Sequence, residues 1–221
     1  MRIRSFIIAY ALVLAILLFA DRRPASTQQD RYSRVVDLTE GQNAVTPYAP
    51  AMESRTRIIA PGALIPGTWA AGQIPPERLV APLVVMDLNA ADGSRQISLD
   101  DISAWEARHG MIPQGAVVAI RRARARTVVS DDLSTAPLPM ASDAAMFLID
   151  ARYTIGFVVE TPVDLTSDRT LSRQLALHGD YVVEGAARFA SLPEIGSLII
   201  VAPAKDRKPG EAPVRILAMV R

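Results

Sequence analysis

The chain has 221 residues, half of them hydrophobic, and a formal net charge of +1. This length suits one compact domain with short terminal segments, and the near-neutral charge gives no overall sign of nucleic-acid binding. Because the chain has no cysteine, disulfide bonds, thiolate metal sites and thiol nucleophiles are excluded.

The first segment of the chain is typical of a targeting or anchoring sequence. An uninterrupted apolar run, FIIAYALVLAILLFA at 6–20, ends abruptly at charged residues. Its length leaves both a cleavable signal peptide and a membrane anchor open. Cleavage requires a small side chain three residues before the cut, where the two candidate cuts place Leu18 or Arg23. We therefore predict that residues 1–23 form an uncleaved signal anchor, a single transmembrane helix.

The flanking charges predict the orientation of this anchor. Arg2 and Arg4 precede the apolar run, whereas Asp21 offsets one of the two arginines that follow it. The positive-inside rule then places the N-terminus in the cytoplasm. We expect residues 24–31 (PASTQQDR) to be a linker at the inner or plasma membrane and residues 32–221 to form a periplasmic or extracytoplasmic domain.

Short apolar runs rich in β-branched residues predict strands in this domain. The seven runs are 35–38, 83–88, 116–120, 155–159, 181–183, 198–202 and 214–220.

Three segments between these runs have the start and stop signals of helices. The segment 98–109 begins with a serine cap that has Asp101 as its capping-box partner, and it ends before Gly110. The segments 142–152 and 168–178 have apolar residues at helical spacing. Because strands and helices alternate, we predict an α/β domain.

Seven segments of the chain resemble the cyclase family of metal-dependent hydrolases, which includes bacterial kynurenine formamidases. In chain order they are VVDLT (35–39), TRIIAPGAL (56–64), QIPPERLVAPLVVMDL (73–88), IPQGAVV (112–118), GFVVETPVD (156–164), LSRQLALHGDYVVEG (171–185) and EAPVRILAM (211–219). The resemblance implies a swivelling β/β/α domain that often forms dimers or tetramers. It also implies hydrolysis of amides or lactones with one or two divalent metals.

The motif that defines the family, His-x-Gly-Thr-His-x-Asp-x-Pro-x-His, is altered in this chain. Alignment on Thr56 and Pro61 puts other residues at its three histidine positions and its aspartate position. These residues are Glu53, Arg57, Ala63 and, for the aspartate, Ile59. A later histidine ligand aligns with Ser172, whereas a glutamate ligand is retained as Glu184.

These substitutions argue against a metal site. Arginine is permanently protonated and cannot bind a metal, and one carboxylate cannot hold a catalytic divalent ion. We hypothesise that Arg57 instead pairs with Glu184 or Glu160. The vestigial pocket then consists of Glu53, Arg57, Ile59, Ala63, Glu160, Asp164, Ser172 and Glu184. We predict no catalytic residue, no metal ligand and no cofactor.

The two histidines do not offer an alternative metal site. His109 and His178 each precede a glycine at the end of a predicted helix. An imidazole there usually caps the helix or complements its dipole, and neither histidine has a second ligand at helical spacing.

One dense basic patch, made of Arg121, Arg122, Arg124 and Arg126, follows a predicted strand. It suits contact with anionic lipid head groups or with an acidic partner, although Asp131 and Asp132 could neutralise it. Nucleic-acid binding is not predicted, because no interleaved aromatic residues or recognition helix accompany these arginines.

The leading hypothesis is a membrane-anchored, non-catalytic protein of the cyclase fold. It would act as an accessory or structural subunit of a membrane complex, such as an energy-transducing one, or would self-associate. One alternative is a formamidase-type hydrolase with a rearranged metal site. Another is a small-molecule binding module in which Arg57 holds a carboxylate.

Overall fold

The computed structural model describes residues 32–40, 56–88, 96–122, 140–160, 163–164, 169–205, 208 and 210–221. Within the compact unit Ser33–Arg221 the strands form one sheet. The strands are β1 (Arg34–Asp37), β2 (Arg57–Ile59), β3 (Val80–Leu88), β4 (Val117–Arg122), β5 (Gly156–Val159), β6 (Tyr181–Glu184), β7 (Ser197–Pro203) and β8 (Glu211–Val220). The helices are α2 (Leu99–His109), α3 (Ser142–Arg152) and α4 (Thr170–Leu177), and the short 3-10 turns are η2 (Pro61–Ala63), η3 (Ala71–Gln73), η4 (Pro76–Arg78) and η6 (Phe189–Ser191).

The sheet closes into a mixed barrel of seven strands. Its order is β1-β8-β2-β6-β5-β4-β3-β7, and β7 also pairs with β8. Strands β3, β4, β5 and β6 are parallel to one another, and the other pairings are antiparallel. Among the strands of the described residues, closure leaves β1 outside the barrel, paired along the second half of β8.

Strands β1 and β2 lie one after the other along the same side of β8. Arg34–Asp37 pair with the last residues of β8, and Arg57–Ile59 pair with its first residues. Glu40, which follows β1, and Thr56, which precedes β2, lie next to each other, because the backbone N–H of Glu40 donates to Thr56 Oγ1 at 2.7 Å. The Thr56 hydroxyl in turn donates to the carbonyl of Gly185 at 2.7 Å, which joins this point to the end of β6.

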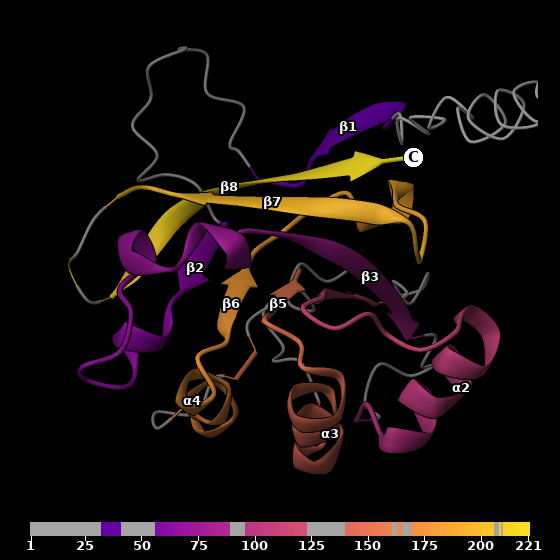
Figure 1. Cartoon of the computed structure of the whole chain (residues 1–221), viewed down its shortest axis with the longest axis horizontal. Coiled ribbons are helices and arrows are strands. Elements are labelled where there is room, and N and C mark those ends of the chain that lie inside the picture. Colours follow the sequence, from indigo (N-terminus) through magenta and orange to yellow (C-terminus); the bar gives the residue numbers. More distant parts are fainter. Residues whose placement is uncertain are drawn as a thin grey trace, which may run out of the picture. The chain divides into compact units, whose positions relative to one another are not determined.

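Two hydrophobic cores lie on the two faces of the parallel strands. Leu83 and Val85 point into the barrel, whereas Val84 and Met86 pack against the helices. This alternation follows from the two-residue period of a strand. Figure 1 shows the corresponding layers, with α2, α3 and α4 along one side of β3–β6 and with β7, β8 and β1 on the other side.

Helix α2 begins and ends at the residues that the capping signals predict. Ser98 and Asp101 form a capping box, in which the Ser98 N–H donates to Asp101 Oδ2 at 2.9 Å. The Trp105 indole N–H donates to the carbonyl of Val85 at 3.1 Å and so fixes α2 on β3. The Arg152 guanidinium binds both Glu106 oxygens, at 2.6 and 2.8 Å, and ties α3 to α2.

The structure confirms the predicted α/β class, and each of the seven predicted strands and three predicted helices occurs. Strand β2 was not predicted as a strand, because its three residues are too few for a visible pattern. The predicted transmembrane helix and linker at 1–31 lie outside the described residues. Among the residues that the structure describes, no helix is both long and apolar enough to cross a membrane.

Candidate functional site

Residues of the predicted vestigial pocket lie where β2, β6 and β8 meet. Arg57 is opposite Glu184 in the β2–β6 register and opposite Pro213 in the β2–β8 register, two residues after β8 begins at Glu211. The carboxyl ends of the parallel strands of an α/β sheet are the usual place for a ligand site. The site therefore occupies the edge at which a functional centre is expected.

An ion-pair network crosses this edge. Arg57 Nε lies 3.3 Å from one carboxylate oxygen of Glu211, and Arg169 Nη1 lies 2.9 Å from the other. The hypothesis that Arg57 pairs with Glu184 or Glu160 is therefore wrong. The strand registers pair Arg57 with Glu184 and with Pro213, but the Arg57 guanidinium reaches along β8 to Glu211, which is opposite Ile59. The Glu184 carboxylate instead accepts from a backbone donor.

Glu184 is held in a more buried position. Its carboxylate accepts a hydrogen bond from the backbone N–H of Val163 at 2.8 Å. Burial raises the pKa of Glu184 above its ordinary value, although the Val163 hydrogen bond and the charge of Arg169 oppose this. A carboxylate with a raised pKa in this place is a poor free ligand, because it already has a hydrogen-bond donor and is costly to ionise.

Asp164 and Ser172 are brought together, and their contact serves helix α4. Asp164 Oδ2 accepts hydrogen bonds from the Ser172 backbone N–H at 3.1 Å and from its hydroxyl at 3.3 Å. Ser172 is in the first turn of α4, where backbone N–H groups lack partners within the helix. Asp164 thus caps α4 from a distance, and Ser172, 2% exposed, is not available to a ligand.

The remaining predicted residues form an apolar wall or lie elsewhere. Ile59 is 2% exposed and belongs to the core between the barrel and the helices, and Ala63 in η2 packs against that core. Glu160 directly follows β5 and is half-buried. Glu53 lies outside the described residues.

Two residues of the network, Arg169 and Glu211, were not identified from the sequence. Arg169 precedes α4 with a left-handed backbone conformation, and Glu211 opens the last strand. Glu211 opens the segment EAPVRILAM but was given no role there, Arg169 lies outside the segments that carry the resemblance, and the fold of the chain brings both to Arg57. No local signal in the sequence could have found them.

The residues present at this edge do not fit a divalent metal ion. In the described part of the chain no three histidine, cysteine, aspartate or glutamate side chains converge as a ligand set. The Glu211 carboxylate is shared by two guanidinium groups, which repel a divalent ion.

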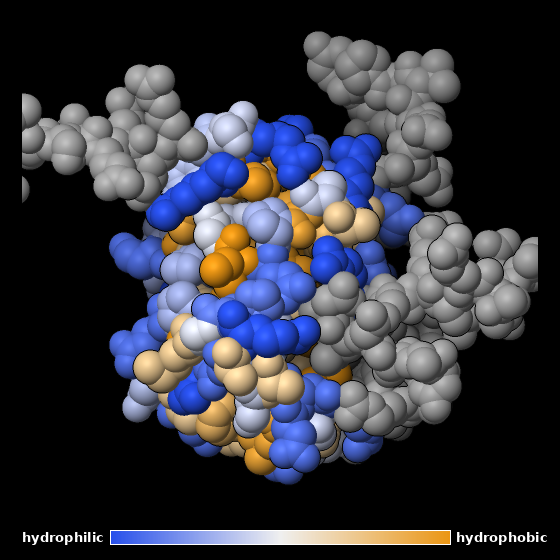
Figure 2. Space-filling view, turned by 90° about the vertical axis from the view of Figure 1, so that its right-hand side faces the viewer, coloured by the Kyte–Doolittle hydropathy of each residue, from blue (hydrophilic) through white to orange (hydrophobic). Residues whose placement is uncertain are grey.

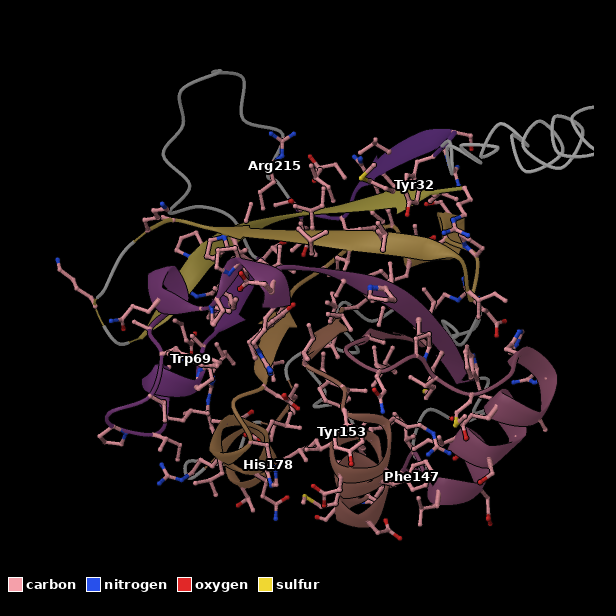
Figure 3. All side chains as sticks on the ribbon, viewed as in Figure 1. Tyr32, Trp69, Phe147, Tyr153, His178 and Arg215 are labelled. Carbon is pink, nitrogen blue, oxygen red and sulfur yellow. The ribbon has the colours of Figure 1, made fainter. Side chains whose placement is uncertain are left out.

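The two histidines lie on different helices and each faces one carboxylate. His109 Nε2 is 2.7 Å from Glu194, and its ring packs on Trp105 with centroids 4.7 Å apart. His178 Nδ1 is 3.7 Å from Asp150 on α3, and Figure 3 shows His178 near the end of α4. These contacts join elements of the fold and do not bring the histidines together.

The predicted basic patch is only partly described. The Arg121 guanidinium donates to the carbonyl of Phe189 at 3.1 Å, which joins the end of β4 to η6. Arg122 ends β4, and Arg124 and Arg126 lie outside the described residues.

Comparison with known proteins identifies the family. A closed mixed barrel with helices on its parallel strands defines the class of cyclase-type α/β folds. The profile of the cyclase family, described as "Putative cyclase", matches residues 35–163. The chain therefore belongs to the cyclase family, as the resemblance predicted.

Several solved structures of isatin hydrolases and of a predicted metal-dependent hydrolase share this fold. Isatin hydrolase A from Labrenzia aggregata, bound to benzyl benzoate, is 24% identical, with a TM-score of 0.68 over 91% of this chain and 99% of that one. Isatin hydrolase A from Ralstonia solanacearum is 25% identical, with a TM-score of 0.66 over 85% of this chain and 92% of that one. A predicted metal-dependent hydrolase from Bacillus stearothermophilus is 25% identical, with a TM-score of 0.56 over 85% and 88%. No curated protein sequence matches the chain.

Proposed function

We propose that this chain is a non-hydrolytic member of the cyclase family, anchored to a membrane by residues 1–23, that serves as an accessory subunit of a membrane protein complex. The observation that carries the first part is the position of Arg57. It stands where the family motif has a histidine, and it shares Glu211 with Arg169.

The physical argument concerns charge. A catalytic divalent ion needs about three donor groups and an open position, at which bound water loses a proton. Here a permanent cation occupies one donor position, and the buried Ile59 replaces the carboxylate of the motif. A side-chain ion pair between β2 and β8 thus lies at the edge where the motif would supply metal ligands.

The membrane part of the proposal is supported by the sequence. The apolar run 6–20 and the short linker confine the domain to a membrane surface. Confinement raises the effective concentration of the domain for partners in the same membrane. A domain without metal chemistry benefits from this through binding, and the complex could be an energy-transducing one.

The experiment compares metal content and activity. The full-length chain in detergent and the isatin hydrolase A of Ralstonia solanacearum are analysed in parallel for bound zinc and manganese and for turnover of isatin and of an aryl formamide. We expect the relative to hold metal and hydrolyse isatin, and this chain to do neither. One tightly held metal per chain with turnover of either substrate would overturn the non-hydrolytic proposal.

The accessory role is tested by identifying the proteins that co-purify with the chain. Mild solubilisation of its native membrane and mass measurement of the intact assembly should show stoichiometric partner subunits. A chain that is isolated only by itself, as monomer or homo-oligomer, contradicts the accessory role.

A small-molecule binding role has weaker support. Arg57 is 40% exposed and could contact a carboxylate. However, the Glu211 carboxylate already pairs with both arginines of the network. An anionic ligand would have to compete with Glu211 for the two guanidinium groups.

A further inference from the structure

We infer that the surface around β1 binds anionic lipid head groups and orients the domain on the membrane, an inference that rests on the proposed anchor. The surface is formed by the side chains of Arg34, Val35, Arg188 and Arg215, and we call it the β1 arginine patch. It is distinct from the run of arginines at 121–126.

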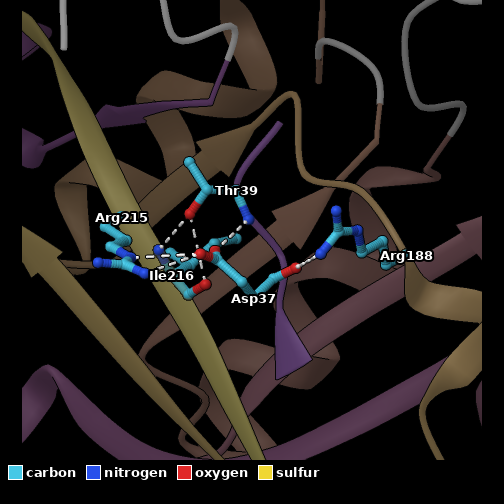
Figure 4. A network of polar contacts seen from close by, with 5 residues as sticks. All are labelled: Asp37, Thr39, Arg188, Arg215 and Ile216. Atoms are coloured by element: carbon cyan, nitrogen blue, oxygen red, sulfur yellow. Dashed lines mark hydrogen bonds and ion pairs between the residues drawn. The ribbon is translucent and has the colours of Figure 1, made fainter. Parts of the chain in front are cut away.

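The patch is assembled by contacts across three parts of the fold. Arg34 donates to the carbonyl of Ser191 in η6 at 2.6 Å, and Arg188, directly before η6, donates to the carbonyl of Asp37 at 3.4 Å. Arg215 on β8 binds Asp37 Oδ2 at 3.0 Å. Figure 4 shows Arg188 and Arg215 approaching β1 from its two sides. Strand β1 thus has guanidinium groups along it and on both sides.

These contacts leave most of the positive charge in place. Carbonyl oxygens are neutral, so in these contacts between described residues Asp37 is the one carboxylate that offsets the three arginines. Each guanidinium has five N–H donors, and the Arg215 side chain is 68% exposed. Phosphate oxygens can therefore be bound without breaking the contacts that position the arginines.

An exposed apolar side chain accompanies the charges. Val35 on β1 is 60% exposed. Val35 leaves β1 on the same face as Asp37, which binds Arg215, whereas Arg34 leaves it on the other face. An apolar side chain beside a guanidinium suits the boundary between head groups and acyl chains, where cations meet phosphate and the apolar group meets glycerol and tail carbons. A soluble acidic partner would need no such group. The composition therefore favours a lipid surface over an acidic protein.

The patch follows the predicted anchor closely in the sequence. Strand β1 begins at Arg34, three positions after the predicted linker ends at residue 31, and Ser33 N–H donates to the carbonyl of Val220 at 2.8 Å. The eight residues 24–31 reach at most about 28 Å when fully extended. Any bilayer that holds residues 1–23 is thus within reach of this end of the domain.

Hydrophilic side chains cover much of one side of the described domain. Figure 2 shows this face, on which hydrophobic areas lie among the hydrophilic ones. A polar surface of this kind suits contact with head groups without deep insertion.

The experiment uses the lack of cysteine in the chain. Ala190→Cys in η6 and Ala151→Cys at the end of α3 each give one exposed labelling site. Figure 1 shows α3 on the side of the sheet away from β1, so the second site is the control. Each labelled full-length chain is reconstituted in phosphatidylcholine vesicles with and without phosphatidylglycerol, and energy transfer to a head-group acceptor is measured.

We expect energy transfer at position 190 to rise when phosphatidylglycerol is present, and transfer at position 151 not to rise. The double variant Arg34→Gln, Arg188→Gln should shift the equilibrium between bound and free orientations by about fivefold per arginine, or about 25-fold in total. The matched control is Arg108→Gln, Arg173→Gln, which removes the same charge from exposed positions on α2 and α4. This control should keep the rise.

Equal transfer from position 190 in both kinds of vesicle overturns the inference, and so does an equal loss in the two double variants. Failure of the anchor has a different signature, because alkaline carbonate would then extract the unmodified chain from both kinds of vesicle. In that case co-sedimentation of the same variants with anionic and neutral vesicles decides the inference. Loss of anionic-vesicle binding only in Arg34→Gln, Arg188→Gln supports it, and any other result rejects it.

Discussion

Arg57 and Glu211 are 154 positions apart in the chain and yet share an ion pair. The motif alignment singled out Arg57 because a cation stands at a position where the family has a histidine. Its partner was not predictable, since it depends on the register in which the last strand enters the barrel. At the scale of single residues, the sequence therefore predicts which chemistry has changed, and the long-range pairing determines what replaces it.

Loss of the Arg57–Glu211 ion pair should have only a small effect on stability. Both side chains are more than a third exposed, so water screens their attraction. Arg57→Ala should lower the free energy of unfolding by about 0.5 kcal/mol, and by less than about 1 kcal/mol. Urea denaturation beside Arg173→Ala measures this. A loss of several kcal/mol would mean that the Arg57–Glu211 pair contributes far more to stability than its solvent exposure suggests.

Asp180 predicts a pH dependence of stability. Its side chain is 2% exposed, and burial raises its pKa from 3.8 to about 7, although Arg78 at 2.9 Å opposes the shift. A raised pKa means that the folded state binds the proton more tightly than the unfolded state. The contribution of protonated Asp180 to the free energy of unfolding is fully present below pH 3.8 and is lost as the pH rises to about 7. Glu184 acts in the same direction.

The measurement is thermal melting between pH 4 and pH 8 of the parent and of Asp180→Asn, which keeps an oxygen for Arg78 but does not titrate. The free energy of unfolding of the parent should fall by roughly 2–4 kcal/mol as the pH rises from 4 to 8, and that of the variant should fall much less. Arg215→Gln, which leaves this pair intact, serves as control. Identical pH profiles for the parent and Asp180→Asn would show that Asp180 stays ionised throughout.

Secondary-structure elements were predicted well where their patterns are local. The capping box at Ser98 and Asp101 and the terminator Gly110 fixed both ends of α2, and the β-branched runs located the strands. Strand β3 begins at Val80 and is therefore longer than predicted. Pro82 interrupts the apolar run in the sequence, but in the structure it is paired with Leu198 of β7. The order of the strands could not be read from their patterns, because period-two alternation specifies faces and not neighbours.

The cap of α4 gives a prediction for a whole element. Asp164 lies outside the helix, but its Oδ2 accepts from the Ser172 N–H in the first turn. Asp164→Ala should cost about 1 kcal/mol of stability, as the loss of a helix cap does, and Asp164→Asn should recover most of it because it keeps an acceptor. Chemical denaturation of the three chains tests this. Equal losses in both variants would assign the effect to charge and not to capping.

Considered as a whole, the domain is closed by its last strand. Strand β8 pairs with β1, β2 and β7, so it joins the two ends of the barrel to each other. Its inward side chains Val214, Ile216, Ala218 and Val220 are buried in the barrel core. Neither the family resemblance nor the composition indicated that one strand pairs with three others and closes the barrel.

Removal of residues 211–221 should therefore abolish cooperative unfolding, whereas removal of β1 should only lower stability, because β1 lies outside the closed barrel. Near-ultraviolet circular dichroism during heating distinguishes the outcomes. A sharp transition in the chain without β8 would show that the remaining strands close without it.

The closure by β8 also bears on how the domain folds during synthesis. Strand β8 follows all its pairing partners in the sequence, so the barrel stays open until β8 has emerged from the ribosome. During that interval β2 and β7 have unpaired edges, which other extended chains can join. Pairings so distant in sequence also form slowly. A newly made molecule thus passes through a vulnerable stage in which protection by a chaperone decides between maturation and aggregation.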